Sequence, residues 1–200
     1  MKKFSSILII SLLTIGSFSG CSEDTIPVDV TVRGSYNIGQ QSTTITYQPK
    51  GIDEERSLRL VIWYPTNETD GVEPLWGDSL LDVAPIPEGD FPVLVYSHGT
   101  SSFAECAYDL AEYYASHGFV VASADHSGDT TANRNDPRTT EMYVQRPQDI
   151  SAVIDYIYDL PADNPLAGRL TEDLALAGHS FGGWNVFSAV GGTFSEEELA

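Results

Sequence analysis

The chain has 200 residues, with 29 acidic and 10 basic side chains and a formal net charge of −19 at pH 7. A surface of this charge repels nucleic acid and anionic lipid, so neither is expected as a partner. The only cysteines in the sequence are Cys21 and Cys106. Because Cys21 lies at the end of the N-terminal leader described next, Cys106 has no second cysteine in the domain to pair with, and a framework of internal disulfides is excluded.

The N-terminal residues have the pattern of a secretion signal. Lys2 and Lys3 form a positively charged start, and the apolar run that follows over residues 7–15 is too short to span a bilayer. We therefore predict a signal peptide over residues 1–20 and an extracytoplasmic location for the protein.

The end of this segment, the Phe-Ser-Gly-Cys of residues 18–21, resembles the processing site of a bacterial lipoprotein. The resemblance implies cleavage before Cys21, lipidation of that cysteine, and a tether over residues 21–29 between the lipid and the domain. Ser22 follows the cysteine, which by the sorting pattern of such proteins favours the outer membrane or the cell surface. An ordinary secretion signal with an incidental cysteine is the alternative.

Residues 30–200 are predicted to form one domain that begins with strands. Residues 28–32 and 43–47 alternate with period two, which indicates strands with one face in water. Residues 58–64 indicate another strand, and the aperiodic residues 66–91 are predicted to form a long loop.

Buried strands and helices alternate through the rest of the chain. Nearly unbroken apolar runs predict strands over residues 91–96, 119–124 and 174–177. Helices are predicted over residues 103–117, from Pro147 to Leu160, and over 184–190, with a loop over 126–146. This alternation predicts an α/β fold with an open, mostly parallel sheet and helices on both faces.

A glycine-flanked serine follows the last predicted strand. Residues 178–183 read Gly-His-Ser-Phe-Gly-Gly and precede a helix, which is the G-x-S-x-G pattern of a nucleophile elbow with Ser180 as the nucleophile. Gly178 and Gly182 remove side chains that would collide at so sharp a turn. The alternative is an unreactive serine in a glycine-rich turn.

Several separated segments point to one family. In chain order they are Arg59–Pro65, Tyr96–Gly99, Ser116–Val121, Asp125–His126, Arg146–Ile150 and Gly178–Gly183. Together they resemble the α/β-hydrolase fold, and more closely the branch that holds platelet-activating-factor acetylhydrolases and dienelactone-hydrolase-like esterases. The likeness covers roughly residues 43–190.

The resemblance implies roles for individual residues. Ser180 is the nucleophile, and the backbone N–H groups of Phe181 and Thr100 form the oxyanion hole. His98 and His126 are candidates to line the pocket; the alternatives are that His98 braces the oxyanion loop and that His126 is a structural histidine. A serine hydrolase of this kind needs no metal ion and no organic cofactor.

The order of the residues conflicts with a complete catalytic triad. An elbow serine is normally followed in the chain by an acid and then by a histidine, but all four histidines precede Ser180. We expect that the C-terminal third, whose strands carry the Asp and the His, is missing, and that residues 30–200 are a truncated α/β-hydrolase domain without turnover of its own. The strand over 174–177 is then expected to be an uncovered edge.

These expectations combine into a predicted function. The protein is predicted to be a serine carboxylesterase or acylhydrolase that acts on small-molecule short-chain acyl esters, with lipid esters among the candidates. A lipid on Cys21 is predicted to anchor it to a membrane. The alternative is a non-catalytic surface lipoprotein that uses a hydrolase scaffold for binding.

Overall fold

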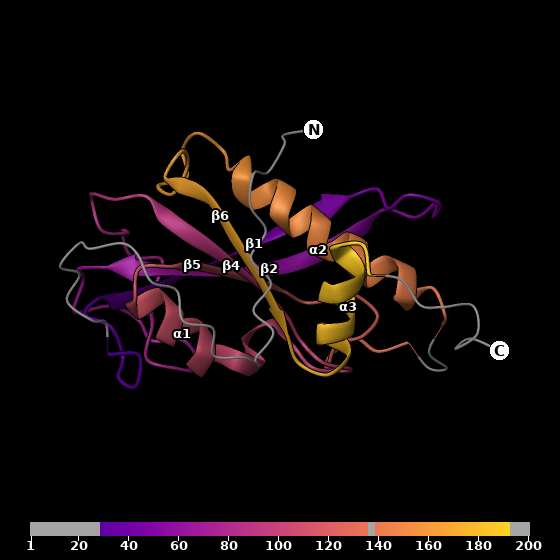
Figure 1. Cartoon of the computed structure of the whole chain (residues 1–200), viewed down its shortest axis with the longest axis horizontal. Coiled ribbons are helices and arrows are strands. Elements are labelled where there is room, and N and C mark those ends of the chain that lie inside the picture. Colours follow the sequence, from indigo (N-terminus) through magenta and orange to yellow (C-terminus); the bar gives the residue numbers. More distant parts are fainter. Residues whose placement is uncertain (1–28, 136–138, 193–200) are drawn as a thin grey trace, which may run out of the picture.

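A sheet of six strands with helices on both faces forms the domain in the computed structural model, which describes residues 29–135 and 139–192 (Figure 1). The strands are β1 (Asn37–Tyr47), β2 (Arg56–Thr66), β3 (Leu80–Leu81), β4 (Phe91–Ser97), β5 (Val120–Ala124) and β6 (Leu170–Gly178). The helices are η1 (Ala104–Ala107), α1 (Tyr108–Ser116), α2 (Met142–Tyr158) and α3 (Phe181–Ala189). Helix α1 covers one face of the sheet, and α2 and α3 cover the other.

Apart from the short strand β3, which pairs in parallel with β1, the sheet is antiparallel on one side and parallel on the other. Its order is β3-β1-β2-β5-β4-β6; β2 is antiparallel to both β1 and β5, whereas β4 is parallel to both β5 and β6. The carboxyl ends of β4, β5 and β6 therefore meet at one edge, where open α/β sheets bind their ligands. The predicted α/β sheet with helices on both faces is confirmed.

Two apolar clusters hold the layers together because successive side chains of a strand point to opposite faces. In β4, Val93 and Val95 pack toward α2, whereas Leu94 between them packs toward α1. Strand β5 repeats this pattern, with Val120 and Ala122 on one side and Val121 on the other. Apolar burial on both faces explains why these strands are continuous hydrophobic runs in the sequence.

Two sequence predictions are wrong in detail. Residues 29–32 form no strand; the Thr31 amide and hydroxyl donate hydrogen bonds of 2.9 and 2.6 Å to Asp29 Oδ1, and this local turn replaces strand pairing. The loop predicted over 66–91 contains the short strand β3, which pairs with β1.

Helix α2 also begins earlier than predicted. It starts at Met142, so that Pro147 lies inside the helix instead of opening it. A proline there forgoes one backbone hydrogen bond. The additional N-terminal turn buries Met142 and Arg146, and this burial offsets the loss.

Strand β6 forms one edge of the sheet within the described residues, as expected from the sequence, and Leu174 is its one buried residue. The predicted signal peptide, the lipidation site Cys21 and nearly all of the predicted tether lie outside the described residues. Among the described helices, none combines the length and the apolar character that a membrane crossing requires.

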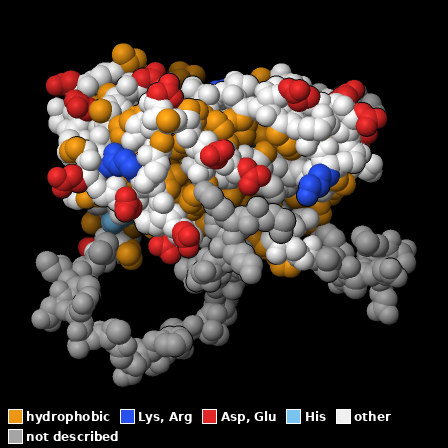
Figure 2. All heavy atoms as spheres, turned by 90° about the horizontal axis from the view of Figure 1, so that it is seen from above, with side chains coloured by type: hydrophobic (Ala, Val, Ile, Leu, Met, Phe, Trp, Pro, Cys, Tyr) orange, Lys and Arg blue, Asp and Glu red, His pale blue; other side chains and the backbone are white. Residues whose placement is uncertain are grey.

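Acidic side chains are spread over the face that Figure 2 shows, with few basic ones and with apolar areas between them. This distribution follows from the composition of the chain, in which acidic residues outnumber basic ones. The exclusion of nucleic acid as a partner stays a prediction.

Candidate active site

Ser180 lies in the sharp turn between β6 and α3. Its φ of 55° and ψ of −122° lie in a region that residues with a side chain rarely adopt. The side chain is exposed, at the carboxyl edge of the parallel strands. A strained, exposed serine at the N-terminus of a helix has the geometry of a nucleophile elbow.

The elbow packs tightly against the loop that follows β4. The His179 amide donates a 3.2 Å hydrogen bond to the Ser97 carbonyl oxygen. A Cβ atom added to Gly182 would lie 1.9 Å from the same oxygen, and one added to Gly178 would lie 2.4 Å from the backbone of Gly182. Both glycines are therefore required for the turn to close against this loop.

We call residues 97–101 the oxyanion loop, because it carries Thr100, one of the two predicted donors. An ideal Cβ atom at the neighbouring Gly99 would lie 3.5 Å from the Ser180 Cβ atom, so the loop borders the nucleophile directly. Within the described part of the chain, neither the Thr100 amide nor the Phe181 amide donates a hydrogen bond to another residue. Both are thus available to bind a developing negative charge.

A pocket of about 260 Å³ opens beside these two donors. It is lined by Thr100, Thr139, Thr140, Met142, Tyr143 and Phe181. The Phe181 and Trp184 rings stack with centroids 5.4 Å apart, and Tyr143 meets both rings edge-on. The wall formed by the start of α3 and the start of α2 is therefore aromatic.

The two histidines predicted as pocket candidates lie in the core instead. His98 and His126 are buried, and neither is among the residues that line this pocket. The His126 amide donates to His98 Nε2 at 3.2 Å, so that nitrogen is unprotonated, and His98 Nδ1 donates to the Gly99 carbonyl oxygen at 2.6 Å. His98 therefore braces the oxyanion loop, one of the alternatives that the sequence left open.

His126 connects two further residues in an array that resembles a catalytic triad. Its Nε2 atom lies 2.8 Å from Ser97 Oγ, and its Nδ1 atom lies 2.9 Å from Asp149 Oδ2. All three side chains are buried, so no substrate reaches this serine. The array is structural, and because Nε2 is engaged by Ser97, His126 is not the base for Ser180.

Burial determines the protonation of both rings. It lowers the pKa of His98 to about 3, and the neighbouring His126 adds to the effect. Burial also lowers the pKa of His126, although the hydrogen bond to Asp149 opposes the shift. Both imidazoles are neutral at physiological pH, which matches their hydrogen bonds.

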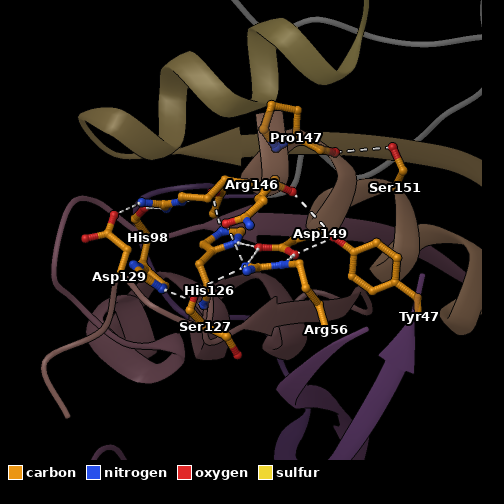
Figure 3. A network of polar contacts seen from close by, with 12 residues as sticks. Tyr47, Arg56, His98, His126, Ser127, Asp129, Arg146, Pro147, Asp149 and Ser151 are labelled. Carbon is orange, nitrogen blue, oxygen red and sulfur yellow. Dashed lines mark hydrogen bonds and ion pairs between the residues drawn. The ribbon is translucent and has the colours of Figure 1, made fainter. Parts of the chain in front are cut away.

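Asp149 on α2 accepts hydrogen bonds from residues on β1, on β2 and in the loop after β5 (Figure 3). It accepts hydrogen bonds from the Tyr47 hydroxyl at 2.6 Å, from Arg56 at 2.9 Å through two nitrogens, and from His126. Burial alone would raise the pKa of this carboxyl, but the hydrogen bonds from His126 and Arg56 outweigh it and hold the pKa below its usual value. Asp149 is therefore a buried carboxylate anion.

Arg146, one turn earlier on α2, forms a second buried ion pair. Its Nη1 atom donates to Asp129 Oδ2 at 2.7 Å, and Nη2 donates to the His98 carbonyl oxygen and, at 3.4 Å, to Ser97 Oγ. Burial lowers the pKa of Arg146 to about 10, against the opposing attraction of Asp129. The guanidinium therefore remains charged at neutral pH.

Sequence reasoning assigned no role to Arg146, Asp149 or Asp129. A signal was present, because Arg146 and Asp149 are three residues apart and share a helix face with the buried Ile150 and Val153. Charged residues on an apolar face of a helix indicate a paired, buried network. Within the described residues, no group of three or more His, Cys, Asp or Glu side chains is arranged to hold a metal ion.

Comparison with known proteins agrees with this geometry. The sheet order, the flanking helices and the elbow are those of an α/β-hydrolase, which confirms the predicted fold class. A family model described as chlorophyllase matches residues 64–199, and the chain belongs to the chlorophyllase family. The narrower acetylhydrolase branch inferred from the sequence stays a prediction.

Solved structures show the same fold at low sequence identity. A ferulic acid esterase from Streptomyces cinnamoneus has a TM-score of 0.64 and 19% identity, over 80% of this chain and 57% of that chain. A dienelactone hydrolase-like promiscuous phosphotriesterase from metagenomic libraries has a TM-score of 0.45 and 14% identity, over 75% of this chain and 53% of that chain. The chain thus spans little more than half the length of these structures. No curated protein matches it.

Proposed function

We propose that the complete gene product is a serine carboxylesterase with Ser180 as its nucleophile. The observation that carries the proposal is the exposed, strained Ser180, which precedes the Phe181 amide and borders the loop that carries the Thr100 amide; neither amide has a partner among the described residues. Membership of the chlorophyllase family and the fold shared with an esterase support it.

The geometry supports acyl transfer through a covalent intermediate. Ser180 Oγ attacks the ester carbonyl carbon while its proton passes to a base, and the carbonyl oxygen becomes an oxyanion. The Phe181 and Thr100 amides then bind this oxyanion, and loss of one such donor costs about 3 kcal/mol of transition-state stabilisation. As the oxyanion collapses, the bond to the alkoxide oxygen breaks and the base gives its proton to this oxygen, so the alcohol leaves. Water then adds to the acyl-enzyme, the carboxylic acid is released, and Ser180 Oγ regains a proton. Among the described residues no histidine is hydrogen-bonded to Ser180, so the base is not assigned to any of them.

The pocket beside the donors supports a small acyl group as the substrate moiety. Its volume of about 260 Å³ is below the usual range of roughly 300–1,000 Å³ for ligand pockets. The apolar wall of Met142, Tyr143 and Phe181 favours a short hydrocarbon or aromatic acid over a charged one. We accordingly propose short-chain acyl esters as the substrate class.

The test is hydrolysis of p-nitrophenyl acetate, butyrate and octanoate by the complete gene product. Ser180→Ala should abolish turnover, whereas Ser151→Ala, an exposed serine on α2, should leave it unchanged. A fluorophosphonate should label the wild-type protein on the peptide that contains Ser180. Full activity in Ser180→Ala would refute the proposal, and binding of esters without hydrolysis would favour the non-catalytic alternative.

We also propose that Cys21 carries a lipid that anchors the protein outside the cytoplasm. The support is the sequence pattern of residues 18–21, which resembles a lipoprotein processing site. Metabolic labelling with an alkyne fatty acid should mark the wild-type protein and not Cys21→Ser. Equal labelling of both proteins, or of neither, would contradict the anchor.

A further inference from the structure

The oxyanion loop is held on both sides of Thr100 by a single ion pair. Before Thr100, the Arg146 guanidinium binds the His98 carbonyl oxygen. After Thr100, the Ser101 amide donates a 2.9 Å hydrogen bond to Asp129 Oδ1, whose second oxygen receives Arg146 Nη1. Ser101 has a φ of 53°, so the bond to Asp129 also fixes a strained backbone conformation.

The same guanidinium touches the other predicted donor. Arg146 Cζ lies 4.8 Å from the centroid of the Phe181 ring, within the range of a cation–π contact. Phe181 is the first residue of α3, and its amide is the oxyanion donor that follows the nucleophile. One buried side chain thus contacts the segment on each side of the oxyanion hole (Figure 3 shows Arg146 with Asp129 and His98).

We propose that Arg146 is a positioning residue that sets the distance between the Thr100 and Phe181 amides, and that Asp129 is its partner in this role. The inference rests on the proposed esterase function. Arg146 reaches no substrate, because it is only 1% exposed. It acts through the backbone of the oxyanion loop on one side and through the Phe181 ring on the other.

An arginine suits this position better than a lysine. The guanidinium is planar, presents donors in a fixed fork and stacks on aromatic rings, whereas an ammonium is a compact point charge. Here two nitrogens reach two different acceptors, Asp129 and His98, while Cζ lies over Phe181. Arg146→Lys keeps the charge but cannot make all three contacts, so it tests geometry with little change in net electrostatics.

The experiment measures hydrolysis and inhibitor binding in the complete gene product. For Arg146→Lys we expect kcat/KM to fall about 10- to 100-fold, since small misplacements of catalytic groups have effects of this size. A trifluoromethyl ketone analogue of the substrate forms an oxyanion with the serine, and its inhibition constant should rise by a similar factor. A carboxamide with the same acyl chain forms no oxyanion, and its affinity should stay unchanged.

Two further variants separate positioning from loss of stability. Asp129→Asn removes the other partner of the ion pair, so it should also weaken binding of the ketone while leaving binding of the carboxamide unchanged. This variant tests the proposal even if Arg146→Lys fails to fold. Glu112→Gln removes a buried carboxylate on α1, and it should lower stability without a selective weakening of ketone binding.

The outcomes distinguish this inference from the proposed function. If the wild-type protein hydrolyses esters and both Arg146→Lys and Asp129→Asn keep full kcat/KM, the positioning role is wrong. An equal loss of affinity for ketone and carboxamide would likewise overturn it and indicate a general structural role. A wild-type protein that neither hydrolyses esters nor binds the ketone would instead refute the proposed function.

Discussion

Two buried carboxylates on opposite faces of the sheet have similar partners but connect different parts of the molecule. Glu112 on α1 accepts hydrogen bonds from the Asp78 and Ser79 amides, at 2.7 and 2.9 Å, and from Arg33 at 2.9 Å. Asp149 on α2 accepts from Tyr47, Arg56 and His126. Both are fully buried, and both have an arginine partner.

The two networks differ in where they lead. The contacts of Glu112 end at Arg33, before β1, and at the loop before β3, so this carboxylate ties α1 to these two segments. Those of Asp149 continue through His126 to Ser97 in the oxyanion loop. A buried charge can therefore affect the proposed oxyanion hole only when its hydrogen bonds lead to the loop that forms it, as those of Asp149 do.

Of the substitutions in the two networks, Asp149→Asn should destabilise the protein most. The change leaves Arg56 and His126 without a buried anion, and removing one partner of a buried ion pair typically costs about 3–5 kcal/mol. We expect that loss in the free energy of unfolding from urea titration, together with reduced ester hydrolysis. A loss below about 1 kcal/mol would mean that water or rearrangement compensates Asp149, which the burial of the network argues against.

Lowering the pH should reduce the free energy of unfolding through His98, whose ring lies 4.8 Å from that of His126 in the Asp149 network. Its folded pKa of about 3 lies below the ordinary 6.5, so the unfolded chain takes up the proton first as the pH falls. Stability is therefore complete above pH 6.5 and is lost progressively as the pH falls toward 3, at up to about 1.4 kcal/mol per pH unit.

Urea titrations at pH 7, 6 and 5 measure this loss, which should reach about 2 kcal/mol at pH 5. His98→Gln should remove the share of the loss that comes from His98, whereas His126, whose pKa burial also lowers, keeps its own share. The lowered pKa of Asp149 adds to the loss only at lower pH, below the ordinary carboxyl value of 3.8. An unchanged slope in His98→Gln would show that another group causes the acid sensitivity.

The smallest expected effect belongs to Glu112→Gln. Glutamine keeps the shape and one acceptor oxygen but loses the charge that pairs with the half-exposed Arg33, at a cost of about 1–2 kcal/mol. Urea titration should show this loss while kcat/KM stays within a factor of two of the wild-type value. A large fall in kcat/KM would show that the Glu112 network also reaches the active site.

The elbow was predictable from the sequence because its causes are local. Gly178, Ser180 and Gly182 lie within five residues, and both glycines are required by one turn whose close contacts involve its own backbone and one neighbouring loop. The buried strands were predictable for a similar reason, since apolar burial on both faces leaves a continuous pattern. For the elbow and the buried strands, the residue types and their spacing in the sequence are therefore nearly sufficient for the prediction.

The Arg146 and Asp149 networks could not be predicted in the same way. Their partners Tyr47, Arg56 and Asp129 come from other elements, and the pairing depends on the tertiary fold. The rule that proline favours the first turn of a helix also placed Arg146 in a loop, although the segment Arg146–Ile150 was part of the family resemblance. The motif was visible, but its role required the contacts.

The left-handed conformation of Ser180 has a consequence for the evolution of this protein. A glycine in that position would adopt the same φ of 55° without steric cost, so Ser180→Gly should make the fold more stable while removing the proposed nucleophile. Selection for stability alone would favour glycine at this position, so the proposed esterase activity supplies the reason for a serine there. Under the proposed function, the backbone strain at Ser180 therefore lowers the stability of the fold in exchange for a reactive side chain.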